Sequence, residues 1–427
     1  MLSRETSVKE LENGEIIEYA QKIVRQGLGP ICDHCLGRQF AKVSSGISNK
    51  NRGEILKEGL RTKGEGIEEG KCWLCNGLFD NLEVWVSKAV EALKEYEYGS
   101  FLVGTKVSGL IIENEELMWE MAGASYAEPL KAELNREVGK RIEQATGKIA
   151  EFDRPEVVVL LNLWTEAVEL QVNSVFIYGR YRKFKRGIPQ TRWFCRECRG
   201  RGCERCNFTG KMYAESVEEL IKDSILDEFQ SVDMVLHGSG REDIDARMLG
   251  SGRPFVAELR EPKRRNVDLQ MLEAKVKEKN VGKLEVTGLQ YVNREMVARV
   301  KNAKADKTYR VEVLLKTGVN EAELRAAVAK LNGAEIVQRT PMRVVHRRAD
   351  LVRKRRVYEM KLMNYAKGSC DIEILCDGGL YIKELFSGDS GRTKPSLSEL
   401  LGTDAEVKEL DVVAVNLDFF SNTLFFS

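Results

Sequence analysis

Eight cysteines in four CxxC pairs constrain what this chain can fold into more than any other feature of its sequence. The pairs are Cys32 with Cys35, Cys72 with Cys75, Cys195 with Cys198, and Cys203 with Cys206. A CxxC turn presents two thiolates to one metal ion, and two such turns complete the tetrahedral set of sulfurs that zinc prefers. The sequence therefore predicts two zinc sites with four cysteine ligands each.

The spacing supports the two predicted sites to different degrees. The second set is compact, and Gly200 and Gly202 allow the tight turn between its two pairs. The pairs that begin at Cys32 and Cys72 are far apart in the sequence, and redox dithiols or buried core cysteines are the alternatives for either set. Four sulfurs leave no open position on the metal, which indicates a structural rather than a catalytic ion.

The charge balance restricts the search for partners to local clusters. The chain carries 67 lysines and arginines against 66 acids, a net charge of +1, so the total charge does not predict a polyanionic partner. No apolar stretch reaches the roughly 18 residues of a membrane-spanning helix, and the first residues lack the apolar centre of a secretion signal. We expect a soluble, cytoplasmic protein without a membrane partner, in which the thiols stay reduced.

Helical periodicity and alternating strands divide the 427 residues into three predicted parts. Residues 1–84 form a zinc-binding amino-terminal segment, and a succession of helices and strands over 85–180 predicts a small α/β domain. From 181 to 427, including a zinc ribbon at 193–210, most strands follow one another without parallel crossovers. This pattern predicts an α+β domain with a mixed, mainly antiparallel sheet flanked by helices.

Two basic stretches stand out against the neutral background. Residues 178–193 read YGRYRKFKRGIPQTRW, in which aromatic residues interleave with six cations, and residues 343–356 read RVVHRRADLVRKRR with Asp350 as the one acid. Basic runs are also typical of solvated faces and linkers. Two such stretches with interleaved aromatics favour a nucleic-acid surface, where cations neutralise phosphates and rings stack on bases.

The segment GREDIDARMLGSGRPF, residues 240–255, concentrates acids, arginines and glycines directly before an apolar strand. A β-hairpin whose turn is stabilised by a local arginine–aspartate pair is one interpretation. Downstream, KTYRVEV places Tyr309 in the middle of an alternating strand. Further on, YIKELFSGDSGRTKPS places Tyr381, Ile382 and Lys383 where a strand gives way to a helix.

These motifs, together with TPMRVVHRR at 340–348, resemble the archaeal and eukaryotic tRNA pseudouridine synthase family that carries a zinc-binding region and a THUMP-like RNA-binding fold. The resemblance runs from the first CxxC pair to the last strand. It implies that 85–180 is the THUMP-like domain and 181–427 the catalytic domain. It also implies that uridines 54 and 55 of the tRNA TΨC arm are isomerised to pseudouridine by one aspartate, without an organic cofactor.

The resemblance leaves two candidates for that aspartate. Other pseudouridine synthases often carry a glycine five positions after the nucleophile, and Asp245 meets this pattern through Gly250, whereas Met248 stands five positions after Asp243. We therefore predict Asp245 as the nucleophile and keep Asp243 as the reserve. Arg241 and Arg247 are expected to keep the carboxylate ionised by lowering its pKa.

The resemblance assigns further roles to residues that are ambiguous by themselves. Tyr309 would stack on the uracil and assist proton removal, although a tyrosine in such a strand is commonly a core residue. Lys383 would pair with the catalytic aspartate, although it also reads as an exposed helix lysine. The predicted substrate-binding residues are Tyr309, Tyr381, Ile382, Leu410 and Arg247.

Two other classes of function are compatible with parts of the sequence. A zinc-containing tRNA-binding protein without catalysis would share the cysteines and the basic stretches. A cysteine-based thiol-transfer enzyme would need a nucleotide-binding loop, and no GxxxxGK[ST] motif is present. The enzymatic interpretation predicts structural zinc, a tRNA partner rather than DNA, and a monomer.

Overall fold

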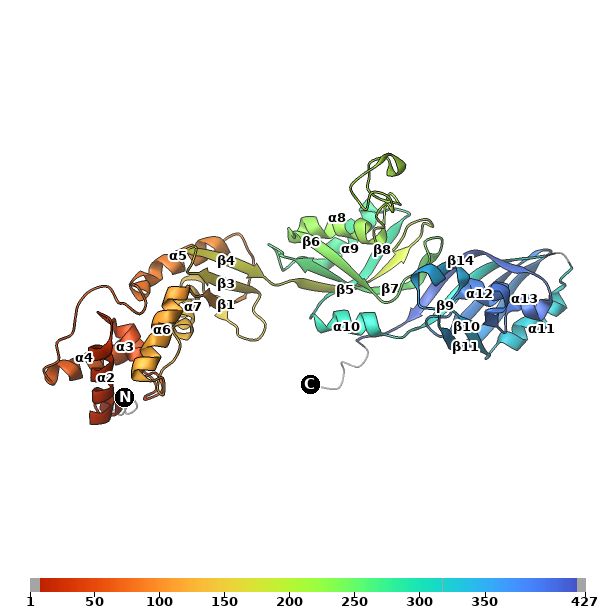
Figure 1. The fold of residues 1–427 in the computed structure, drawn as a ribbon. Helices are drawn as coiled ribbons and strands as arrows, with labels where there is room; N and C mark the ends of the chain where they lie inside the picture. Colours follow the sequence, from red (N-terminus) through yellow and green to blue (C-terminus); the bar gives the residue numbers. More distant parts are fainter. Residues whose placement is uncertain (1–7, 317, 421–427) are drawn as a thin grey trace. The chain divides into compact units, whose positions relative to one another are not determined.

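The computed structural model describes residues 8–316 and 318–420, which fall into two compact units (Figure 1). The first unit runs to Asn173 and includes Lys263–Arg265, and the second contains Ser174–Pro262 and the chain from Asn266 onward. Within the described ranges, every helix is too short or too polar to span a bilayer.

The first unit combines a four-stranded sheet with helices. The sheet has the order β2-β1-β3-β4, in which β1 is parallel to β2 and β3, and β4 is antiparallel to β3. The elements are α2 (Gly14–Gln26), α3 (Asp33–Arg38), α4 (Asn49–Thr62), η1 (Leu78–Asn81), α5 (Leu82–Leu93), β1 (Ser100–Lys106), α6 (Gly109–Ala122), α7 (Leu130–Thr146), β2 (Ile149–Ala150), β3 (Val157–Asn162) and β4 (Ala167–Val172).

One hydrophobic core holds this first unit together. Leu36 and Phe40, which follow the first cysteine pair, belong to the same core as Phe101 of β1 and Val159 of β3. The helix α3, which holds Cys35 and begins after Cys32, packs against α4 and α7, and α2 packs against α6. The predicted boundary after residue 84 therefore does not separate two cores in the structure.

The second unit contains one ten-stranded sheet in the order β13-β10-β11-β12-β9-β14-β7-β5-β8, with β6 paired to β7. Among the described strands of this sheet, only β14 and β7 pair in parallel, which confirms the predicted mainly antiparallel α+β fold. The elements are β5 (Val175–Lys183), η2 (Glu204–Cys206), α8 (Val217–Phe229), β6 (Asp233–Gly238), β7 (Arg247–Arg260), α9 (Leu269–Lys279), β8 (Leu284–Val292), α10 (Glu295–Asn302), β9 (Asp306–Leu315), α11 (Glu321–Leu331), β10 (Glu335–Arg339), η3 (Met342–Arg347), β11 (Val352–Ala366), β12 (Ser369–Cys376), α12 (Ile382–Ser387), η4 (Gly388–Gly391), β13 (Thr393–Lys394), α13 (Leu397–Leu401) and β14 (Ala405–Asn416).

The strand β5 runs through the predicted domain boundary at 180/181. It is an inner strand of the large sheet, between β7 and β8, so the second unit begins at Ser174. Its inward side chains include Tyr181 and Lys183, both 0% exposed. In the sequence, the cations of 178–193 indicate a solvated face, a linker or a nucleic-acid surface, yet Lys183 lies inside the core.

Helices cover the two halves of the sheet. Figure 1 shows α8 and α9 beside β6 and β8, and α11 to α13 around β9 to β11 and β14. The strands β9 and β14 cross the middle of the sheet, and they form the surface on which the loop after β6 and the start of α12 come together.

Candidate active site

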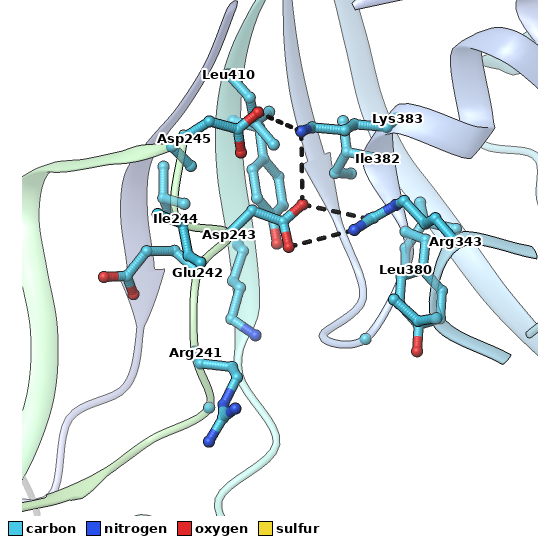
Figure 2. A pocket seen from close by; sticks show the side chains of 18 of the residues that line it. Arg241, Glu242, Asp243, Ile244, Asp245, Arg343, Leu380, Ile382, Lys383 and Leu410 are labelled. Atoms are coloured by element: carbon cyan, nitrogen blue, oxygen red, sulfur yellow. Dashed lines mark hydrogen bonds and ion pairs between the residues drawn. The ribbon is translucent and has the colours of Figure 1, made fainter. Parts of the chain in front are cut away.

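A cavity of about 1000 Å³ opens on the second unit where the β6–β7 loop, β9, β14 and the start of α12 meet. Figure 2 shows Asp243 and Asp245 of the loop facing Lys383 of α12. The structure brings most of the predicted site residues to this cavity. The ones that line it are Asp243, Asp245, Tyr309, Tyr381, Ile382, Lys383 and Leu410.

A buried ionic network around Glu242 stabilises the β6–β7 loop. The guanidinium of Arg253 donates to the Glu242 carboxylate at 2.7 Å, and the phenol of Tyr181 donates to it at 2.9 Å. The ammonium of Lys183 lies 3.7 Å from the same carboxylate and donates to the carbonyl of Ile188 at 2.7 Å. Figure 2 shows Glu242 pointing away from Lys383. Glu242 is among the residues that line the cavity, but its side chain is 1% exposed and its carboxylate is taken up by this network, so we assign it to the support of the loop.

The network explains how a carboxylate can stay ionised inside the protein. Burial by itself would raise the pKa of Glu242, but the charges of Arg253 and Lys183 and the hydrogen bond from Tyr181 lower it below its ordinary value. The charges are paired and hydrogen-bonded, as buried charges must be.

Asp245 is the more accessible of the two candidate nucleophiles. One of its carboxylate oxygens lies 2.5 Å from the Lys383 ammonium, and its side chain is 66% exposed. Partial burial would raise the pKa of Asp245, but the hydrogen bond and charge of Lys383, with the charge of Arg343, lower it. The group is therefore ionised at neutral pH, as a nucleophile must be.

Asp243 has a more crowded environment. Its carboxylate lies 3.2 Å from the Arg343 guanidinium and 3.8 Å from the Lys383 ammonium, and its side chain is 34% exposed. Arg343 also donates to Glu384 at 2.6 Å, which fixes the guanidinium against the start of α12. Asp243 thus bridges two cations, whereas Asp245 is held by a single lysine and faces the cavity more openly.

The structure corrects the expectation that Arg241 and Arg247 keep Asp245 ionised. The guanidinium of Arg247 donates to Asp411 of β14 at 2.9 Å, and Arg247 does not line the cavity. Arg241 lines the edge of the cavity, and in the described chain no ion pair joins it to Asp245. The cations that act on Asp245 come from α12 and from η3, which are distant in sequence.

Gly250 has a geometric reason to stand five positions after Asp245. A Cβ at Gly250 would lie 1.8 Å from the carbonyl oxygen of Val413, and its φ of +51° is in the left-handed region. Only glycine lets β7 approach β14 this closely. The approach brings the residues just before β7 beside Leu410, so the spacing positions the carboxylate against the apolar wall of the cavity.

Arg186 is a positioning residue whose role the sequence did not reveal. Its guanidinium donates to the carbonyl oxygens of Asp245 at 2.8 Å and of Leu410 at 2.7 Å. It also pairs with Asp411 at 2.7 Å. Arg186 therefore ties the loop to β14, although in the sequence it reads as one more cation of a nucleic-acid surface.

The second basic stretch contributes directly to the cavity. Four of its arginines line the cavity: Arg343, Arg348, Arg353 and Arg355. Trp193, the first residue of the predicted zinc ribbon, and Tyr213, which follows the ribbon, line the cavity as well. This concentration of cations beside aromatic rings is suited to phosphates and bases.

Tyr309 lies in the wall of the cavity and is 9% exposed. Burial raises the pKa of its phenol well above the ordinary value. The ring is therefore neutral at neutral pH, which suits stacking against a base and makes it a poor proton acceptor.

The structure brings the cysteines of each predicted zinc site together. The four Sγ atoms of each set lie within 4.8 Å of one another. The Sγ distances of Cys32 to Cys75 and of Cys195 to Cys203 are both 3.8 Å. A tetrahedral zinc ion with Zn–S bonds of about 2.3 Å requires sulfurs about 3.8 Å apart, so both sets fit zinc.

Arg38 provides a second indication that the first set fits a metal centre. The guanidinium is 0% exposed, and it lies 2.8 Å from the Cys35 sulfur and 3.2 Å from Glu115. Four thiolates around one Zn²⁺ carry a net charge of −2, and a buried arginine at this position offsets part of that charge.

Comparisons with known proteins agree with these motifs. A family model described as "Pus10, C-terminal" matches residues 176–416, and one described as "Pus10 THUMP domain, archaeal" matches residues 85–162. The tRNA pseudouridine synthase Pus10 of Methanothrix thermoacetophila is 47% identical, over 94% of each chain. The Halorubrum lacusprofundi protein of that name is 45% identical, over 94% of this chain and 96% of the relative.

A chain in the crystal structure of a Cbf5-Nop10-Gar1 complex also matches, at 16% identity and with a TM-score of 0.30. It covers 47% of this chain and 45% of that chain. This score is too low to support an inference.

The family model and these relatives define the class of protein, an enzyme that isomerises uridine to pseudouridine in tRNA. The chain belongs to the Pus10 family. The predicted family, fold class and enzymatic activity are confirmed, and tRNA is the substrate. The two alternative classes, a tRNA-binding protein without catalysis and a thiol-transfer enzyme, do not apply.

Proposed function

We propose that this enzyme modifies uridines 54 and 55 in the TΨC arm of tRNA, with Asp245 as its nucleophile. The observation that carries the proposal is the ionised Asp245 carboxylate, held 2.5 Å from Lys383 at the edge of the cavity that Tyr309 lines. The likeness of the catalytic motifs to the family that acts on positions 54 and 55 supports the choice of target. No organic cofactor is needed for this chemistry.

The cavity suggests how the substrate is held. A uridine must leave its stack to react, and unstacking costs a few kcal/mol that aromatic and phosphate contacts repay. In this proposal Tyr309, Ile382 and Leu410 enclose the base, with Tyr381 beside them. The cavity arginines take up the phosphates, and the THUMP-containing first unit grips the tRNA elsewhere.

Lys383 and Arg186 would position the nucleophile. Lys383 orients the Asp245 carboxylate and keeps it ionised, while Arg186 fixes the backbone of the same residue. The carboxylate then either attacks C1′ of the ribose or adds to the uracil ring. In both routes the base must turn and rejoin the ribose through carbon before it can diffuse away.

The choice of target predicts a specific modification pattern. An unmodified tRNA transcript incubated with the purified chain should acquire pseudouridine at both 54 and 55, without added cofactor. Transcripts with cytidine at 54 or at 55 should lose only the signal at the altered position. Carbodiimide treatment and primer extension map the product, and pseudouridine found only outside the TΨC arm would overturn the assignment while leaving the enzyme class intact.

The proposal includes structural zinc in both four-cysteine sets and a monomeric, cytoplasmic enzyme that acts on tRNA and not on DNA. Every group named at the site comes from one chain, and both cysteine sets need a compartment in which thiols stay reduced. When bound, the ion would crosslink distant segments of the chain. No step of the reaction requires it.

Zinc removal gives a prediction for stability. The purified chain should contain about two zinc ions, and Cys72→Ser or Cys195→Ser should each leave about one, measured by elemental analysis. Structural zinc contributes about 10–16 kcal/mol of binding free energy in small sites. Chelation should therefore unfold the helices around Cys32 and Cys72, seen as lost far-ultraviolet ellipticity, whereas a metal-free chain with an unchanged melting curve would refute the zinc proposal.

A further inference from the structure

Lys307 is a cavity cation for which the reaction described so far has no use. It lies on β9 two residues before Tyr309, so both side chains leave the same face of the strand. Both line the cavity. Within the residues that the structure describes, the Lys307 ammonium forms no hydrogen bond or ion pair, which distinguishes it from Lys383.

The surroundings leave this ammonium open to a ligand. Glycines stand on two sides of it: its Nζ lies 3.8 Å from the place of a Cβ at Gly240 and 3.5 Å from that of a Cβ at Gly378. A side chain at either position would contact the ammonium and crowd it. The loop after β6 and the turn after β12 therefore both leave the lysine accessible.

A half-buried cation without a partner is unfavourable in the empty protein. Burial, followed by the charge of Arg253 on β7, lowers the pKa of Lys307 to about 8, while Cys376 on β12 and Asp306 on β9 act in the opposite direction. A cation whose pKa is perturbed and which lies in a cavity is a candidate functional group. A ligand that brings negative charge would remove the cost.

We propose that Lys307 donates a hydrogen bond to a carbonyl oxygen of the target uracil and stabilises the negative charge that develops there. If Asp245 attacks C1′, the C–O bond forms as the C1′–N1 bond breaks, and the bonding electron pair stays on the uracil as an anion shared with its carbonyl oxygens. If Asp245 adds to C6, the C5–C6 π pair becomes the C4–C5 π bond and the π pair of the C4 carbonyl moves onto its oxygen, which gives an enolate. The same cation serves either route.

The position of Lys307 favours the base over a phosphate as its ligand. Residues two apart on one strand stand about 6.4–6.8 Å apart, close to the width of a pyrimidine with its substituents. A uracil stacked on Tyr309 therefore reaches the ammonium with its edge. Phosphates meet the arginines of the second basic stretch instead.

The test compares Lys307→Met, Lys307→Arg and Lys316→Met with the wild-type chain. Lys316 follows the same strand and pairs with Asp404 at the surface, 70% exposed, so it is the matched control. The measured quantities are the single-turnover rate of tritium release from [5-³H]uridine tRNA with excess enzyme, and the tRNA Kd by filter binding. The inference rests on the proposed role of Asp245, so Asp245→Asn is included.

We expect Lys307→Met to lower the single-turnover rate by about 100-fold, the effect of losing one donor to a developing oxyanion. Its tRNA Kd should stay within about threefold of wild type. Lys307→Arg should recover part of the rate, and Lys316→Met should react like wild type. An unchanged rate in Lys307→Met, or a loss seen only in the Kd with a shallower salt dependence, would overturn the proposal.

The alkaline side of the pH profile gives a second readout. The wild-type rate should fall above about pH 8 as Lys307 loses its proton, with Arg253, Cys376, Asp306 and the neutral Tyr309 as the groups that face it. Lys307→Arg stays charged, so its rate should hold to higher pH. If the rate fell at the same alkaline pH in the wild-type chain and in Lys307→Arg, the inference would be contradicted. Full activity of Asp245→Asn would instead refute the proposed nucleophile.

Discussion

Replacing Asp245 with alanine or asparagine should abolish pseudouridine formation, with a rate loss of about 10³-fold or more. The carboxylate is the one group in the proposed mechanism that forms a covalent bond with the substrate. Because its side chain is 66% exposed, the variants should fold and melt like the wild-type chain. Primer extension on the tRNA transcript measures product, and filter binding should show a Kd within about threefold of wild type.

Asp243 provides the matched control for this experiment. Asp243→Ala removes one partner of Arg343 and a more distant partner of Lys383, but leaves the pair between Asp245 and Lys383 in place. We expect a slower enzyme that still completes the reaction. Activity that survives in Asp245→Ala but not in Asp243→Ala would transfer the nucleophile to Asp243. Activity that survives in both would remove this loop from the chemistry.

The sequence was sufficient for features that depend on local pattern. Four CxxC pairs predict two clusters because the sulfur donors are explicit in the sequence. Alternating strands with few crossovers predict a mainly antiparallel sheet because the period of two is local. The motifs around Tyr309 and Lys383 predict neighbours of the nucleophile through the family resemblance, and the structure brings both to the cavity.

Long-range pairings of charged residues could not be predicted in the same way. Arg186 contacts Asp245 and Leu410, and Arg247 contacts Asp411. These contacts depend on the strand order of the sheet, which no local sequence pattern predicts. Arg186 and Lys183 belong to one basic run. Arg186 joins the β6–β7 loop to β14, whereas Lys183 is buried beneath the loop. A cluster of charged residues in the sequence indicates exposure to solvent or a polyanionic partner. The burial of one of these residues against a distant partner can be seen only in the folded structure.

Replacing Glu242 should have the largest effect on stability of any substitution near the site. Glu242→Ala leaves the guanidinium of Arg253 and the ammonium of Lys183 buried without their anion, and breaking a buried ionic network of this kind costs about 3–5 kcal/mol. In a unit of this size that loss lowers the Tm by roughly 10 °C. Urea unfolding and thermal melting measure it.

The exposed Glu406 on β14 is the control, since its replacement by alanine should change the free energy of unfolding by less than about 0.5 kcal/mol. Glu242→Gln should lie between the two, because the amide still accepts hydrogen bonds from Arg253 and Tyr181 without the charge. If Glu242→Gln were inactive while as stable as wild type, Glu242 would belong to the chemistry and not to the support of the loop.

The pH dependence of stability separates these roles further. The folded-state pKa of Glu242 lies below its ordinary value, so its contribution is complete above the ordinary glutamate pKa and is lost as the pH falls through the lowered one. The wild-type chain should therefore lose its advantage over Glu242→Gln on acidification, and the two free energies of unfolding should converge. A difference that stayed constant from neutral pH into strong acid would mean that Glu242 supports the loop by packing and hydrogen bonding, without its charge.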